Sequence, residues 1–242
     1  MSLFASLADI LYPPACLLCH ARFHPWQPAA DLFCEACAKA LPVNGPPVCT
    51  CCGRELPGAF DAVMLCAACR SGAHAFDRAR APWTYTGPMR DAVRQFKYHR
   101  RWRIGRWLAR EMAAAARRDF PLEELDAVLP VPPHWVKRYA RGFNPVGDLA
   151  RTVSEALGKP CLPAALRRTR WTKTQTRLPS PARARNVQGA FAASHPLAQG
   201  RTFLLIDDVL TSGATADACA RALKAAGASR VFVLTAAQTP VT

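Results

Sequence analysis

The sequence predicts an α/β protein in which helices flank a parallel sheet, preceded by a cysteine-rich metal-binding module. The chain has 242 residues, half of them hydrophobic, which is enough for one large domain or two small ones. Nine of the 11 cysteines lie between Cys16 and Cys69, so the two parts of the chain are stabilised differently. Beyond them, apolar runs alternate with helical patterns, the order that gives a parallel sheet. We therefore expect a metal-binding domain over residues 1–75 and an α/β domain over residues 76–242.

The first elements follow from apolar spacing. Apolar residues at three- and four-residue intervals predict a short helix over residues 3–11, which Pro13 and Pro14 end. After the cysteines, residues 79–85 are expected to form the first strand of the second domain. Residues 88–118 have apolar residues on one side and arginines on the other, which predicts a helical region with a basic exposed face.

The remaining elements give the α/β domain its order. Residues 125–131 are a short apolar run that ends in prolines, so we expect a buried strand that leads into a loop. A helix over 144–157 follows, and then a loop over 167–186 with seven basic and no acidic residues. The last elements are a buried strand over 202–206, a helix over 215–226 that Gly227 stops, and a strand over 230–235.

The cysteines form four Cys-x-x-Cys pairs with a repeated spacing. Fourteen residues separate the first two pairs and thirteen separate the last two, so two successive sites with four cysteines each are the simplest arrangement. The predicted zinc ligands are Cys16, Cys19, Cys34 and Cys37 in the first site, and Cys49, Cys52, Cys66 and Cys69 in the second. Iron–sulfur ligation is a minor alternative.

Four thiolates fill the tetrahedral shell of zinc, so both Zn²⁺ ions are expected to be structural rather than catalytic. Cys51 is left over; we interpret it as a bystander between two ligands, with substitution as a ligand as the alternative. Cys161 and Cys219 are expected to be ordinary small apolar residues.

Charge and hydropathy limit the class of protein. The net charge of +15 suggests an anionic partner such as phosphate, a nucleotide or nucleic acid, although an arginine-rich protein without such a partner is the alternative. No stretch approaches the ~20 apolar residues of a membrane span, and the first residues lack the features of a signal peptide. We expect a cytoplasmic protein with no membrane insertion.

The segment at residues 203–215, FLLIDDVLTSGAT, carries the clearest chemical pattern. A buried strand leads into Asp207 and Asp208, and Thr211, Ser212, Gly213, Ala214 and Thr215 open a helix. Amides and hydroxyls at a helix start bind phosphate, and a glycine there allows close approach. Carboxylates suit sugar hydroxyls and a divalent ion instead. Together these groups predict a site for ribose 5-phosphate.

This segment resembles the signature of type I phosphoribosyltransferases, which bind 5-phosphoribosyl 1-pyrophosphate (PRPP) with Mg²⁺. The whole chain is similar to the competence protein ComF family, which joins a double zinc ribbon to a phosphoribosyltransferase-type domain. The further matching motifs are Phe96-Lys97-Tyr98, Pro130-Val131-Pro132, Arg141-Gly142-Phe143-Asn144, and Gln175 followed by Arg183, Asn186, Val187 and Phe191. One departure is Pro145, where the family pattern has glutamine.

The resemblance implies roles for residues outside the signature. It makes Asp207 and Asp208 the candidate catalytic groups. It also implies that residues 131–141 bind the pyrophosphate, with Val131, Arg138 and Arg141 as candidate contacts and Lys137 as a further counter-charge. It makes residues 167–186 a lid to which Lys173 and Arg183 contribute. A solvated basic loop is the alternative for both segments.

Residues 90–110 suggest a second activity. Aromatic residues alternate there with basic ones, a pattern that holds single-stranded nucleic acid without sequence specificity. The candidate nucleic-acid contacts are Arg94, Lys97, Tyr98, Arg100, Arg101 and Trp102. The alternative is a structural helix whose tryptophans pack on the sheet while its arginines face water.

The expected function is therefore a PRPP-binding protein that assists the handling of incoming single-stranded DNA. The resemblance also suggests a helicase-like translocase as partner. Genuine transfer of ribose 5-phosphate from PRPP to a base or amine remains the alternative, since the residues show the donor half of that machinery and no acceptor site.

Overall fold

The computed structural model describes residues 14–23, 32–58, 64–72, 74–133, 142–170 and 187–240. The helix expected over residues 3–11 lies outside these ranges.

A parallel sheet forms the centre of the structure. Its strands are β1 (Arg78–Arg80), β2 (Trp83–Thr84), β3 (Ala127–Pro130), β6 (Thr202–Leu210) and β7 (Arg230–Gln238). The order across the sheet is β1-β7-β6-β3, with β2 pairing farther along β7, and every one of these pairings is parallel.

Both faces of this sheet are buried. Leu204 and Ile206 pack into the core on one side, whereas Phe203 and Leu205 pack into the core on the other. A strand that is apolar at consecutive positions is typical of a parallel sheet covered on both faces.

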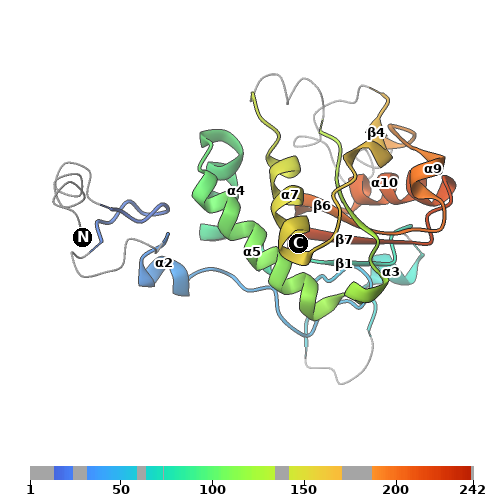
Figure 1. Cartoon of the computed structure of the whole chain (residues 1–242). Coiled ribbons are helices and arrows are strands. Elements are labelled where there is room, and N and C mark those ends of the chain that lie inside the picture. The colour runs from blue at the N-terminus through green and yellow to red at the C-terminus, as the bar shows by residue number, and fades with distance from the viewer. Residues whose placement is uncertain are drawn as a thin grey trace.

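Helices cover each face (Figure 1). The helices α4 (Gly87–His99), α5 (Trp102–Asp119) and α7 (Pro145–Leu157) lie on one face. The other face carries α10 (Ala214–Ala225), the short α9 (His195–Ala198) and an antiparallel hairpin. This arrangement confirms the predicted parallel sheet flanked by helices.

The two cysteine ribbons join different apolar cores, one on each side of the sheet. Cys16 and Phe33 share a core with α5, whereas Cys49 and Cys52 share a core with α10. The ribbons contain the short helices α2 (Glu35–Lys39) and α3 (Ala67–Arg70). The second ribbon therefore buries apolar surface jointly with the α/β part, and the boundary between residues 75 and 76 stays a prediction.

The helical region predicted over 88–118 consists of two helices. Arg100 adopts a left-handed backbone conformation with φ of 51°, and this ends α4. Gly105 then lets α5 pack closely on α4, because a Cβ atom at this position would lie 2.4 Å from the Phe96 ring.

Two boundary predictions were wrong. The loop expected from residue 167 overlaps β4 (Leu166–Arg168), which pairs with β5 (Phe191–Ala193) because Leu166 and Phe191 bury their side chains against α10. The strand expected to end at residue 206 continues to Leu210, because β7 supplies backbone partners as far as Gln238. In the part of the chain that the structure describes, no helix is long and apolar enough to cross a membrane.

Candidate functional site

Each ribbon gathers four cysteine sulfurs around one point. The Sγ atoms of Cys16, Cys19, Cys34 and Cys37, and likewise those of Cys49, Cys52, Cys66 and Cys69, all lie within 4.8 Å of one another. A zinc ion with Zn–S bonds of about 2.3 Å separates its tetrahedral ligands by about 3.8 Å. The Cys19–Cys34 and Cys52–Cys66 sulfur distances are 3.6 Å and 3.7 Å. Both groups therefore fit a structural Zn²⁺ ion, as the sequence predicts.

Backbone amides support the thiolates of both groups. The amides of Leu18 and Cys66 donate to the sulfurs of Cys16 and Cys49, respectively. Burial raises the pKa of the Cys16 thiol, but backbone donors, including Cys19 and Leu18, outweigh burial and bring this pKa to about 6. The same balance brings the pKa of Cys49 to about 7. Burial, with the neighbouring thiols, raises the pKa of Cys37, Cys52 and Cys69 in the same two groups. Four thiolates so close together therefore need a bound cation to hold them in the charged form.

The remaining cysteines do not join these groups. Cys51 lies outside both sets of four sulfurs, and burial raises its pKa, which disfavours its thiolate. Cys219 belongs to α10 and is fully buried on the core side of that helix. Cys161 packs at the edge of the other core.

The second candidate site is the turn between β6 and α10. Gly213 is the N-cap of α10, with φ of 77°, a conformation that favours glycine. Ser212 Oγ accepts a hydrogen bond from the amide of Ala214 at 3.5 Å, and Thr215 lies in the first turn of the helix. Amides in a first helical turn lack partners within the helix, so this turn presents donors to an anion.

The acidic pair lies in β6 itself, directly before this turn. Consecutive strand residues point to opposite faces. The Asp208 carboxylate meets the ammonium of Lys97 from α4 at 2.7 Å, and each of these side chains is 16% exposed. Asp207 contributes instead to the electrostatic environment of Cys219 and Arg168 on the α10 side, and its Oδ1 accepts from the Asp208 amide at 2.8 Å.

Lys97 thus lies within the site of the acidic pair. Burial lowers the pKa of its ammonium, but the charges of Asp208 and Asp207 more than reverse this, so the net shift is upward. The sequence carries a signal for this position, because Lys97 follows Met89 and Val93 at four-residue intervals on the buried side of α4.

The second ribbon contributes side chains to the same turn, which the sequence analysis missed. Arg54 Nη2 donates to the carbonyl of Thr211 at 3.2 Å. His74 lies so close to Gly213 that a Cβ atom there would approach the imidazole Cε1 to 2.9 Å. The amide of Ala75 donates to Asp217, four residues farther along α10. No spacing in the sequence links Arg54 or His74 to this turn, because only tertiary packing brings them there.

His74 and Arg54 both keep buried nitrogens, Nδ1 and Nε, without a hydrogen-bond partner among the described residues. His74 stacks on Phe76 with a centroid separation of 4.5 Å. Burial lowers the pKa of His74, the nearby carboxylate of Asp217 acts against burial, and the net shift is downward. The imidazole is therefore neutral at pH 7.

The predicted pyrophosphate and lid segments are described only in part. Val131 is buried, and its amide donates to the carbonyl of Ile206 at 2.8 Å, so β3 ends beside β6. Arg138, Arg141, Lys173 and Arg183 lie outside the described residues.

The basic surface lies around the junction of α4 and α5. Arg94, Tyr98, Arg100, Arg101 and Trp102 are all exposed there, with Tyr98 at 59% and Trp102 at 46%. Phe143 packs beneath this junction: the Arg100 guanidinium lies 5.6 Å from its ring centre, and the Trp102 ring lies 5.1 Å from it. Trp107 instead packs against Phe33 and Trp83, as a structural tryptophan does.

Comparison with known proteins finds a matching family model and relatives of similar length. Residues 7–70 match the family model described as "Double zinc ribbon domain". The chain is 28% identical over 223 residues to Competence protein F of Haemophilus influenzae, covering 90% of this chain and 94% of the relative. It is 32% identical over 204 residues to the DNA utilization protein YhgH of Salmonella typhimurium, covering 83% of this chain and 88% of the relative.

Among solved structures, the chain overlaps glutamine phosphoribosylpyrophosphate amidotransferase from B. subtilis at 23% identity and a TM-score of 0.37. That overlap covers 53% of this chain and 25% of the other chain. The relatives above 30% identity match over most of their own length, which confirms the resemblance predicted from the motifs. The chain therefore belongs to the family of Competence protein F and the DNA utilization protein YhgH.

Proposed function

We propose that this protein binds PRPP at the turn between β6 and α10, in the cytoplasm, and supports the handling of incoming single-stranded DNA. The observation that carries the PRPP half is the position of Asp207 and Asp208 at the end of a central parallel strand, followed by the hydroxyls and glycine that begin α10. In open parallel sheets, ligands bind at the carboxyl ends of the strands.

The groups around this turn suit a phosphorylated sugar. The first amides of α10 and the hydroxyls of Ser212 and Thr215 would receive the 5-phosphate, and the carboxylates would accept hydrogen bonds from ribose hydroxyls. Mg²⁺ commonly binds proteins through one or two carboxylates together with substrate phosphates. Asp207 and Asp208 point to opposite faces, so one carboxylate joined by oxygens of PRPP fits this ion better than a chelate of both. Mg²⁺ would neutralise charge on the pyrophosphate group.

The DNA half rests on the relatives and on the basic surface. The relatives carry names that refer to competence and DNA utilization. Tyr98 and Trp102 expose aromatic surface among Arg94, Arg100 and Arg101, which suits stacking of bases and neutralisation of phosphates. Lys97 is occupied by Asp208, so it belongs with the sugar site in this proposal. A helicase-like translocase is the partner that such a role would require.

Calorimetry with PRPP and Mg²⁺ tests the first half. We expect binding by the wild type and its loss in the Asp207→Asn, Asp208→Asn double variant, because the charged acceptors for ribose hydroxyls and the anionic ligand for Mg²⁺ are removed. Asp91→Asn, at an exposed position on α4, is the control. Equal binding by the double variant and the control would refute this site.

A second candidate function is transfer of ribose 5-phosphate to a base or amine, with Asp207 and Asp208 as the catalytic carboxylates. The observation that favours it is the approach of Arg54 and His74 from the second ribbon to the turn, where they would border an acceptor. Release of pyrophosphate from PRPP on adding candidate acceptors, abolished in the same double variant, would support transfer. Binding without release would leave PRPP as a bound effector.

A further inference from the structure

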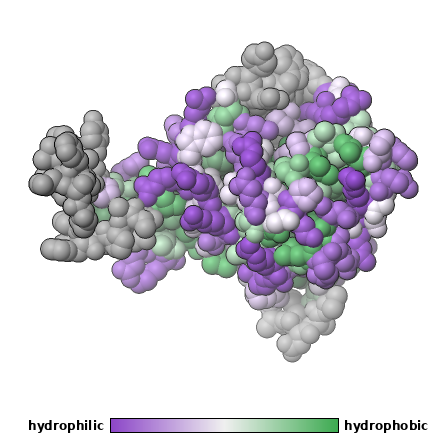
Figure 2. Space-filling model, viewed as in Figure 1, coloured by the Kyte–Doolittle hydropathy of each residue, from purple (hydrophilic) through white to green (hydrophobic). Residues whose placement is uncertain are grey.

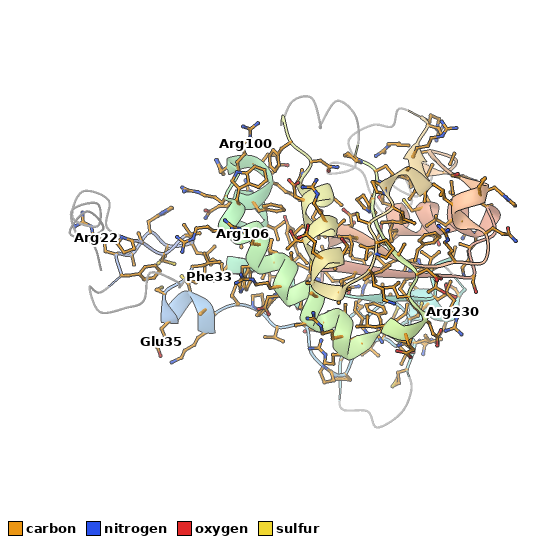
Figure 3. The ribbon with its side chains drawn as sticks, in the orientation of Figure 1. Arg22, Phe33, Glu35, Arg100, Arg106 and Arg230 are labelled. Carbon is orange, nitrogen blue, oxygen red and sulfur yellow. The ribbon has the colours of Figure 1, made fainter. Side chains whose placement is uncertain are left out.

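A groove of about 460 Å³ lies between the first zinc ribbon and α5. Leu32, Phe33 and Ala38 form the ribbon side of the groove. Arg103, Arg106, Trp107 and Arg110 form the α5 side. In Figure 3, Phe33 and Arg106 face each other where the ribbon meets this helix. The groove lies apart from the β6–α10 turn, which the second ribbon borders.

The charge of the groove is uniformly positive. Among the described residues, its lining contains three arginines and no acidic residue. Arg103, Arg106 and Arg110 occur at intervals of three and four residues, so they share one side of α5 and span about 10 Å along its axis. In the ion pairs of the described residues, neither Arg106 nor Arg110 takes part.

Two acidic residues of the described chain lie close to the groove in sequence, and neither lines it. Glu35 of α2 pairs with Lys39 and points away from α5 (Figure 3). Glu111 follows Arg110 on α5 but is not among the lining residues. An anionic ligand in the groove would therefore meet arginines without a facing carboxylate from its lining.

The floor of the groove is apolar and held by the metal-binding ribbon. Phe33 packs edge-on against Trp107, with a centroid distance of 5.0 Å. Leu32 and Phe33 directly precede the ligand Cys34, and Ala38 directly follows the ligand Cys37, so the first zinc site fixes this wall. Figure 2 shows hydrophilic surface over α4 and the start of α5, beside the first ribbon, with apolar patches between the charged residues.

A row of cations above an apolar floor has the chemistry to bind one strand of nucleic acid. Phosphates lie at intervals of about 3.4 Å along a stacked strand, so three arginines over about 10 Å match two or three consecutive phosphates. Sugars and base edges would lie against the apolar floor. Arg103 directly follows Trp102, so the groove continues the exposed aromatic surface at the α4–α5 junction.

We infer that this groove is a binding site for the backbone of single-stranded DNA, formed jointly by α5 and the first zinc ribbon. The inference rests on the DNA half of the proposed function and adds Arg103, Arg106 and Arg110 to the residues that carry it. It also gives the first zinc ion a specific role, which is to hold Phe33 and Leu32 opposite these arginines.

The test is fluorescence anisotropy of the full, zinc-loaded chain with a labelled 20-nucleotide oligodeoxynucleotide, measured over a range of salt concentrations. The Arg106→Ala, Arg110→Ala variant removes two charges from the groove. The Arg117→Ala, Arg118→Ala variant removes two exposed charges from the far end of the same helix and is the control. We expect about tenfold or greater weakening for the groove variant and a loss of about 1.4 from the slope of log K against log salt.

A charge-preserving variant separates recognition from structure. Arg106→Lys with Arg110→Lys should keep most of the salt dependence, because a point charge still neutralises phosphate. Zinc content and the unfolding transition of every variant show that the fold is retained.

Each outcome bears on the inference. Equal affinities of the groove variant and the control would overturn the groove as the site while leaving the proposed DNA function intact. Absence of binding by the wild type would refute both. Displacement of the oligonucleotide by polyglutamate as readily as by unlabelled DNA of equal charge would assign the groove to acidic polypeptides and overturn the inference.

Discussion

The ion pair between Lys97 and Asp208 gives the sharpest prediction about stability. The Nζ and Oδ1 atoms lie 2.7 Å apart, and only 16% of each side chain is exposed. At an effective dielectric constant of about 20, this separation corresponds to a gross attraction of about 6 kcal/mol, which the desolvation of both groups offsets in part. Replacing Lys97 with methionine leaves the Asp208 carboxylate buried without its partner. We expect this to lower the free energy of unfolding by about 3 kcal/mol.

The assays are urea denaturation, which gives the free energy of unfolding, and a thermal melt, which gives Tm; both are followed by tryptophan fluorescence at constant free zinc concentration. For a chain of this size, a loss of about 3 kcal/mol lowers Tm by about 6–12 °C. Lys224→Met is the matched control, because its pair with Asp77 is 36% and 33% exposed and should contribute less than about 1 kcal/mol. The Lys97→Met, Asp208→Asn double variant should recover part of the loss, since it removes the charge that the single variant leaves unpaired.

The pH dependence has a definite sign. The pKa of Lys97 is raised above its ordinary value of 10.5, so the pair stabilises the folded state below that pH, and this contribution is lost as the pH rises through the folded-state pKa. The difference between wild type and Lys97→Met should therefore shrink above pH 10.5. Equal stabilities of the Lys97 and Lys224 variants at pH 7 would refute the reasoning, because they would mean that burial adds nothing to this pair.

Three further predictions concern the turn and its ribbon. Gly213→Val should weaken binding of PRPP at least tenfold in calorimetry, because the added side chain would meet His74 and the backbone at this position must keep φ of 77°. An unchanged affinity would show that the turn does not receive the phosphate. The pKa of His74 is lowered, so the folded state should lose stability as the pH falls from 6.5 toward the folded-state pKa. In thermal melts, His74→Asn should lose less stability than the wild type over that interval. Equal losses in the two proteins would contradict a buried neutral imidazole. Cys52→Ser should reduce the measured zinc from two ions to one per chain and weaken PRPP binding. Cys19→Ser should lose one zinc ion and keep that binding, because the ribbon contacts to the turn among the described residues come from the second ribbon. Equal effects of the two substitutions on PRPP binding would argue against that contact.

The sequence predicted the two groups of four cysteines that the structure brings together, because a Cys-x-x-Cys pair is local and its geometry depends on few other residues. It also predicted the strand, acidic pair, turn and helix of residues 203–215, since the apolar run and the glycine lie next to one another in the chain. The end of β6 was misplaced because strand length depends on β7, whose residues are more than twenty positions away. Partner residues this far away in sequence do not change the local hydrophobic pattern of the strand.

The basic residues show the same contrast between features set by the local sequence and features set by distant contacts. Alternating aromatic and basic residues marked the α4–α5 junction, and the structure exposes Tyr98 and Trp102 there. Composition could not separate Lys97 from its neighbours, because its position is set by a carboxylate on β6 and by the buried face of α4. Trp107 resembles Trp102 in sequence context, yet packing against Phe33 makes it part of the core.

By itself, then, the sequence determined the two groups of four cysteines, the class of fold and the order of strand, acidic pair, turn and helix in residues 203–215, because each depends on residues that are neighbours along the chain. Only the tertiary structure decided that the two ribbons join different cores, one beside the arginines of α5 and one against the turn at Gly213. The physical reason is that the hydrophobic effect is non-directional, so an apolar side chain does not specify which partner surface it will pack against. The ribbons' positions follow from which cores Phe33 and Cys52 complete, and that depends on the whole folded chain.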